Sequence, residues 1–133
     1  MIKISYREKF IKSIKEQFAA ETEVYRRKEK AESLLFEYFG ELVEELFDET
    51  EAADEKLEIE YDKIKLNGTE LGFDFVNGTI EVYTTVEDSE EKKIIDRLED
   101  NGTAYISKQH KVELSEDLLD VYLKQLYEGN FKS

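Results

Sequence analysis

The chain has 133 residues, of which 40% are hydrophobic and 12% aromatic, enough to bury one core of moderate size. It contains no cysteine, which excludes disulfide frameworks, thiolate metal sites and cysteine nucleophiles. Its formal net charge of −14 argues against direct nucleic-acid binding, because most of the surface would repel a phosphate backbone. We therefore expect one domain over residues 1–133.

The beginning of the chain does not resemble a secretion signal. MIKISYREKF is charged by its third residue and lacks the apolar core of a signal peptide. No apolar run approaches the roughly 18 residues that a membrane span requires. The sequence predicts a cytoplasmic protein without membrane contact.

Residues 1–50 form the predicted helical region. The chain has no proline and its first glycine is Gly40, while residues 20–30 are nearly all polar. The pattern fits either a helix hairpin that turns near residues 20–22 or one long helix with a solvated centre. Apolar residues recur every three to four positions in two stretches, which are Tyr6, Phe10, Ile14 and Phe18, then Leu35, Phe39, Leu42 and Leu46.

Charge reverses within this helical region. Residues 1–30 hold nine Lys or Arg and five Asp or Glu, a net charge of +4, whereas residues 31–60 hold one and twelve, a net charge of −11. The cations are spread around the first helix, unlike those of a membrane-surface helix. We expect the two segments to pair internally if their helices pack antiparallel. The alternative is a basic patch that touches a partner or nucleic acid.

Six carboxylates recur at intervals of four, three, four, three and four residues, so they would line one stripe if the helix persists. At about 1.5 Å per residue, the stripe would extend roughly 27 Å with a carboxylate about every 5 Å. Duplex DNA presents a phosphate about every 3.4 Å per strand. The stripe is either the solvated side of an amphipathic helix or a binding face for a basic protein surface. Its members are Glu37, Glu41, Glu44, Asp48, Glu51 and Glu55.

The segment SLLFEYFGELVEELF, residues 33–47, carries more apolar residues than one buried helix face needs. The helix would then lie buried between the sheet and the first helix. Alternatively, it presents Phe36, Val43 and Phe47 to a second copy of the chain as a homodimer interface.

The tripeptide Asn-Gly-Thr begins at Asn67, Asn77 and Asn101. The three glycines are too widely spaced for a phosphate-binding loop, whereas Asn-Gly readily adopts the positive φ angles of a type I′ hairpin turn. Alternating strands flank the first two copies, with one slip that we expect to be a bulge near residues 62–63. An antiparallel β-meander over residues 56–112 is predicted.

The region before the third copy, residues 89–100, is compatible with a strand or a short helix. We favour the strand, because residues 103–108 form a convincing strand that needs a neighbour. Ser115 as N-cap and Gly129 as terminator define a helix over 115–129. The predicted fold is α+β: an N-terminal helix or helix hairpin packed on a four- or five-stranded antiparallel β-meander, with a C-terminal helix.

Catalytic patterns are sparse. The only histidine, His110, lies in a polar link and is expected on the surface, and no metal-ligand or cofactor motif is present. Close carboxylate pairs are expected by chance among 33 acidic residues. We expect neither a cofactor nor a bound metal, and an enzyme acting through carboxylates is only the third hypothesis.

In its size, acidity, absence of cysteine and mix of meander and helices, the chain resembles small proteins of bacterial phages and mobile elements, including inhibitors of host defence enzymes. The resemblance involves no motif and therefore assigns no residue. We expect a non-enzymatic interaction module whose acidic face binds a basic protein surface as an inhibitor and a possible DNA mimic. The alternative is a self-associating structural or regulatory protein.

Overall fold

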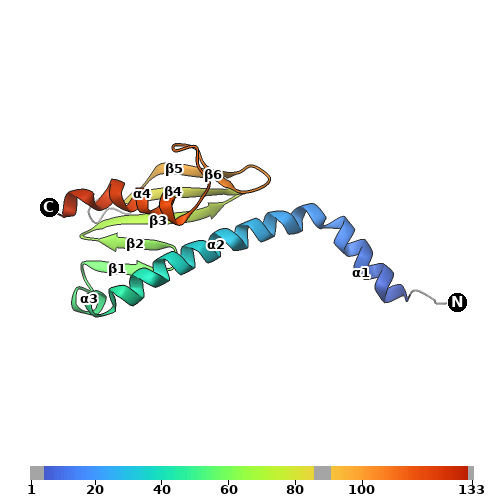
Figure 1. The fold of residues 1–133 in the computed structure, drawn as a ribbon, viewed down its shortest axis with the longest axis horizontal. Helices are drawn as coiled ribbons and strands as arrows, with labels where there is room; N and C mark the ends of the chain where they lie inside the picture. Colours follow the sequence, from blue (N-terminus) through green and yellow to red (C-terminus); the bar gives the residue numbers. More distant parts are fainter. Residues whose placement is uncertain (1–4, 86–90, 132–133) are drawn as a thin grey trace.

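The computed structural model describes residues 5–85 and 91–131. Figure 1 shows a sheet with helices α2 and α4 against it, while α1 and the first part of α2 project away as an arm. In chain order the elements are α1 (Tyr6–Gln17), α2 (Ala19–Glu45), α3 (Phe47–Ala52), β1 (Leu57–Glu60), β2 (Lys63–Leu66), β3 (Thr69–Val76), β4 (Thr79–Thr85), β5 (Lys92–Asp100), β6 (Tyr105–Ser107), α4 (Glu116–Tyr127) and the 3-10 helix η1 (Glu128–Asn130).

The strands form one antiparallel sheet in the order β1-β2-β3-β4-β5-β6, which confirms the α+β meander. The sheet has six strands rather than four or five, because the predicted bulge near residues 62–63 is wrong. Residues 61–62 instead form a two-residue turn between β1 and β2, in which Leu57 pairs with Leu66 and Ile59 with Ile64. The turn restores all four apolar side chains to one face.

The first two Asn-Gly pairs form the predicted hairpin turns. Asn67 and Gly68 have φ angles of 51° and 85°, and Asn77 and Gly78 have φ angles of 46° and 78°. Both residues of each pair thus have the positive φ that a type I′ turn requires. These turns set the registers of β2 against β3 and of β3 against β4.

The third Asn-Gly-Thr tripeptide, which begins at Asn101, directly follows β5 and confirms the strand interpretation for residues 92–100. Residues 89 and 90 lie outside the described residues. In this tripeptide only Gly102 has a positive φ, of 95°. The Asn101 side chain accepts hydrogen bonds from the backbone N–H groups of Thr103 and Ala104, both at 2.9 Å. The β5–β6 connection is therefore a wider loop than the two type I′ turns.

The core lies between one face of the sheet and two helices. Leu35 and Phe39 of α2 meet apolar side chains from the strands, and Leu118 and Tyr122 close the core from α4. Helix α4 begins as predicted, because the Ser115 hydroxyl oxygen accepts a hydrogen bond from the Leu118 N–H at 3.2 Å. Half of α2 and all of α4 thus cover one face of the sheet.

The N-terminal region is neither a hairpin nor an uninterrupted helix. Helix α2 runs straight through residues 20–22, and bends separate α1, α2 and α3 at Phe18 and Leu46. The Thr22 hydroxyl donates to the Phe18 carbonyl at 2.8 Å, a bond that bends helices. The expected internal pairing of the basic and acidic segments is wrong, because both lie on the continuous helix α2 and its extensions. Among the described residues, no helix is long and apolar enough to cross a membrane.

Candidate protein-interaction surface

One side of α2 is buried and the opposite side carries carboxylates. Ala31, Leu35 and Phe39 face the sheet and are at most 4% exposed. The carboxylates Glu37, Glu41 and Glu44 are all exposed. Their spacing of four and three residues keeps them on one side of the helix. The structure therefore brings these three predicted residues together on solvent.

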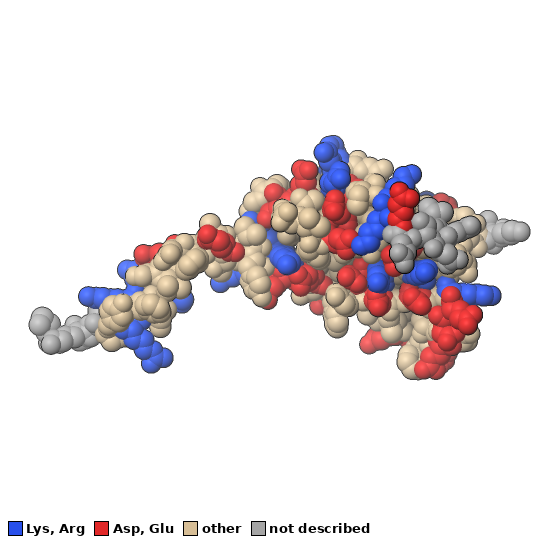
Figure 2. Space-filling model, turned by 180° about the vertical axis from the view of Figure 1, so that it is seen from behind, with Lys and Arg blue, Asp and Glu red and all other residues tan. Residues whose placement is uncertain are grey.

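The single stripe of six carboxylates is wrong, because α2 ends at Glu45 and the bend at Leu46 separates the remaining three carboxylates from the first three. Asp48 and Glu51 belong to α3, whereas Glu55 lies in the turn before β1, and all three are exposed. Figure 2 shows acidic side chains gathered at the α3 end of the molecule and basic ones near the tip of the arm. We call the exposed acidic side of α2 and α3, residues 32–55, the acidic face.

The acidic face also carries apolar side chains. Phe36 is 64% exposed and Phe47 is 57% exposed, while Val43 is half-buried. An interval of seven residues places Phe36 and Val43 along one edge of α2, whereas Phe47 lies beyond the bend at Leu46, at the start of α3. Phe36 also lines a groove with Ser33, Glu37 and other residues of α2, together with Tyr61 of the β1–β2 turn. The fold leaves these side chains outside its core.

Gly40 lies on the same side of α2, among these side chains. A Cβ atom at this position would meet no other atom within 4 Å, so the fold itself does not require a glycine. Glycine inside a helix is about 1 kcal/mol less favourable than alanine. Gly40 therefore lowers the stability of α2, and no steric constraint within a single molecule requires it.

The six predicted carboxylates of the acidic face form no ion pair among the described residues. Exposed ion pairs elsewhere link strands on the outer face of the sheet, such as Lys92 with Asp74 at 2.9 Å and Arg97 with Glu81 at 3.4 Å. At the start of the face Glu32 pairs with Lys28 at 3.8 Å. The acidic face thus combines negative charge and exposed apolar area, and its six predicted carboxylates pair with no cation in the part of the chain that the structure describes.

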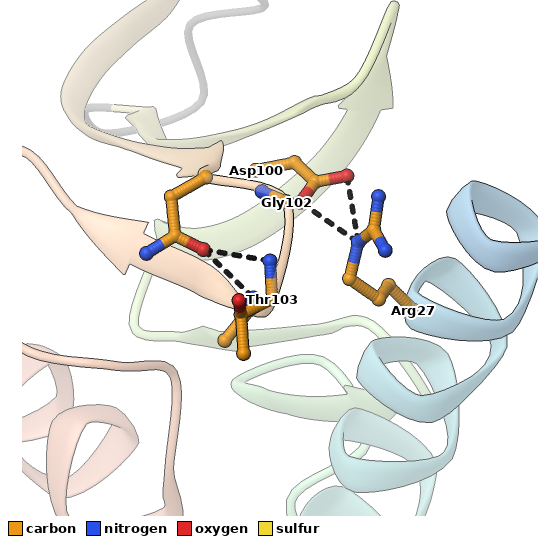
Figure 3. Close-up of polar contacts among 6 residues, drawn as sticks. Arg27, Asp100, Gly102 and Thr103 are labelled. Atoms are coloured by element: carbon orange, nitrogen blue, oxygen red, sulfur yellow. Dashed lines mark hydrogen bonds and ion pairs between the residues drawn. The ribbon is translucent and has the colours of Figure 1, made fainter. Parts of the chain in front are cut away.

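An ion pair sets the position of α2 on the sheet (Figure 3). The Arg27 Nε donates to both carboxylate oxygens of Asp100, at 2.8 and 3.0 Å, and the two side chains are 17% and 11% exposed. One of these oxygens also accepts the Gly102 N–H at 2.9 Å. Charge-assisted bonds of this kind are strong and directional. They fix α2 at the point where the arm leaves the body.

A buried polar cluster surrounds Asp96, on the same strand β5 that ends at Asp100. The Asp96 carboxylate accepts hydrogen bonds from the hydroxyls of Ser107 and Tyr122, both at 2.5 Å, and from the N–H groups of Arg97 and Gln109. Burial alone would raise the pKa of Asp96, but these four hydrogen bonds outweigh it and lower the pKa. With Ser107 and Tyr122 fully buried, the cluster joins β5, β6 and α4.

His110 belongs to the edge of this cluster, so the expectation of a surface histidine is wrong. Its ring centroid lies 6.0 Å from that of Tyr122, and its backbone N–H donates to the Ser107 hydroxyl oxygen at 2.9 Å. The side chain is half-buried, and its Nε2 is enclosed without a hydrogen-bond partner. No local sequence signal indicates these contacts, because they join residues from three separate elements.

Among the described residues, no group of His, Asp and Glu side chains is arranged to hold a metal ion. Asp62 and Asp74 lie near Tyr83 on the outer face of the sheet, where burial raises the pKa of both Asp62 and Tyr83.

No protein-family model matches the chain, and no match was found among curated proteins or among solved structures.

Proposed function

We propose that the protein is a non-enzymatic interaction module whose acidic face binds a basic surface of a protein partner. The proposal rests on one observation: six exposed carboxylates that form no ion pair among the described residues occur in the same α2–α3 region as the exposed rings of Phe36 and Phe47. Aromatic anchors surrounded by complementary charge are typical of protein-binding surfaces. The rings supply apolar contact area, and the carboxylates supply attraction and orientation.

The partner that fits this surface is a protein with a cleft built for nucleic acid. Glu37, Glu41 and Glu44 span about 10 Å of helix, so neighbouring carboxylates rise by about 5 Å. Phosphates along one DNA strand rise by about 3.4 Å. A row of Lys or Arg side chains that binds phosphates would find a similar density of negative charge. Occupation of such a cleft would make the protein an inhibitor, in line with its resemblance to small phage and mobile-element proteins.

The first prediction tests the acidic face against a matched control. A variant with Glu37→Lys, Glu41→Lys and Glu44→Lys should lose its partner. The control carries Glu99→Lys, Glu113→Lys and Glu128→Lys, three exposed carboxylates outside the face, and has the same net charge. Both should fold normally, because exposed charges contribute little to stability. Affinity capture from the native cells, with quantitative mass spectrometry, measures the difference.

The expected outcome is a basic protein that is captured by the wild type and the control but not by the face variant. Nucleic acid added during capture should compete for that protein. Equal capture by all three proteins would show that the carboxylates of the face are only solvated.

A further inference from the structure

The arm, residues 5–26, is helical but lacks a core. All of its residues are exposed. Apolar side chains recur at intervals of four residues along one side of α1, with Tyr6 79%, Phe10 53% and Phe18 44% exposed. Isolated helices as short as α1 are marginal in water, and most helices in proteins are stabilised by burying an apolar side. The arm therefore has the character of a helix that packs against another surface.

The charge of the arm complements the acidic face. Residues 5–26, which precede the Arg27–Asp100 ion pair, carry five Lys or Arg and four Glu, a net charge of +1, and helix α1 within them carries four and two, a net charge of +2, against −11 for residues 31–60. Both surfaces also have an apolar edge, with Phe10 and Ile14 on the arm and Phe36 and Phe47 on the face. Opposite charge around apolar contacts is the pattern of two surfaces that bind each other.

The two surfaces cannot meet within one molecule. Helix α2 is continuous from Ala19 to Glu45, and the Arg27–Asp100 ion pair holds it on the sheet at Arg27. The arm consequently points away from the acidic face of its own chain (Figure 1). Only a second molecule can bring an arm against that face.

Gly40 provides an independent reason to expect a helix on this surface. A Cβ atom there would meet nothing within 4 Å in the monomer, yet the residue lies in the middle of a long helix. Small residues let two helix backbones approach closely. A helix docked between Phe36 and Phe47 would use the space that the missing side chain leaves.

We infer that two copies of the chain exchange arms, each arm lying on the acidic face of the other copy in a two-fold symmetric dimer. One side of this arm of about 22 residues would contact the face, and each copy contributes one arm and one face, which approaches the roughly 20–30 contacting residues per side of a standard interface. An isologous arrangement of this kind closes on itself and does not form filaments. The inference rests on the proposed function, because it assigns the acidic face a basic partner; the arm of the second copy covers that face until an external partner displaces it.

The second prediction is a charge exchange followed by light scattering at tens of micromolar. The arm variant carries Lys9→Glu, Lys12→Glu and Lys15→Glu; the face variant carries Glu37→Lys, Glu41→Lys and Glu44→Lys. The wild type should be a dimer and each variant alone a monomer, with dimer affinity reduced at least tenfold. A mixture of the two variants should form a 1:1 dimer, because both arm–face contacts then join opposite charges again.

Gly40→Gln separates docking from folding. Glutamine is a good helix former, so this variant should remain folded, and its side chain should block the approach of the arm and yield a monomer. A control with Val121→Gln, at an exposed position of α4, should stay dimeric. Dimerisation of Gly40→Gln with wild-type affinity would contradict a helix docked at this position.

The remaining outcomes distinguish the inference from the proposed function. A wild-type monomer at these concentrations would overturn arm exchange, but capture through the acidic face would be unaffected. A wild-type monomer that sediments with anionic phospholipid vesicles would assign the arm to a lipid surface and also overturn the inference. If the variants are monomers and their mixture remains monomeric, the contact does not join arm and face. If the face variant captures the partner as well as the wild type and the control do, while the dimer results hold, the proposed function is contradicted and the dimer is not.

Discussion

At the scale of single residues, Asp96 shows how a carboxylate is accommodated in the core. It is 5% exposed on the inner face of β5, where an apolar residue would be expected from alternation. Four hydrogen bonds satisfy its oxygens, and burial raises the pKa of Tyr122 so that its hydroxyl remains a donor. A buried polar group is tolerated when every partner is present.

The third prediction concerns Asp96 and pH. Asp96→Asn should lower the free energy of unfolding at neutral pH by about 1 to 3 kcal/mol, because donors in the cluster lose their ionised acceptor. The folded-state pKa of Asp96 lies below the ordinary value of 3.8. Its contribution is therefore fully present above that value and is lost as the pH falls through the folded-state pKa. Urea unfolding between pH 7 and about pH 3 measures this loss.

The variant should lose less stability than the wild type over this acidic range. Asp54→Asn, an exposed aspartate with no described ion pair, serves as the control and should follow the wild type. Parallel pH profiles for the wild type and Asp96→Asn would mean that the hydrogen bonds do not favour the ionised carboxylate.

At the scale of elements, the two type I′ hairpins define the registers of the central strands. Gly78 has a φ of 78°, and a Cβ atom there would meet nothing within 4 Å. Any cost of substitution at this position therefore comes from the backbone alone. The same turn places Phe75 opposite Ile80 on the core face.

The fourth prediction is that Gly78→Val destabilises the protein by about 1 to 3 kcal/mol, because a β-branched residue is strained at positive φ. Gly78→Asn should cost much less, since asparagine tolerates this conformation. Chemical denaturation of the two variants measures the difference. Equal stability of the valine variant and the wild type would contradict the hairpin geometry.

These elements also show which parts of the fold can be predicted from sequence. Asn67-Gly68 and Asn77-Gly78 were predictable because a positive φ is a local requirement that few residues satisfy. The turn at residues 61–62 was not, because it uses no positive φ, and the break in alternation equally fits a bulge. The contacts of His110 and Asp96 join distant segments, so no local pattern indicates them.

Part of the acidic face could be predicted, because helical periodicity is a local pattern of the sequence. Helical periodicity placed Glu37, Glu41 and Glu44 on one side, and the structure has them exposed there. The bend at Leu46, which redirects Asp48 and Glu51, has no glycine or proline to signal it. The direction of the arm could not be predicted from the sequence either, because a solvated helix centre and a hairpin turn have the same polar composition.

At the scale of the whole molecule, charge is separated along the longest dimension. The arm is basic and the α3 end is acidic (Figure 2). Separated charges of this kind steer oppositely charged surfaces during encounter and raise the association rate. An external basic partner and the arm of a second copy would then compete for the same acidic face.

The central claim is that this face binds through complementary charge, and the fifth prediction tests it through the association rate of the captured partner. Stopped-flow measurements at concentrations where the monomer predominates would compare the wild type with the face variant over a range of salt. The Debye length, over which salt screens charges, falls from about 10 Å at 0.1 M salt to about 3 Å at 1 M salt. The wild-type rate should fall steeply with salt, while the variant carrying Glu37→Lys, Glu41→Lys and Glu44→Lys should associate slowly at every concentration. Equal rates for the two proteins, with no dependence on salt, would contradict the claim.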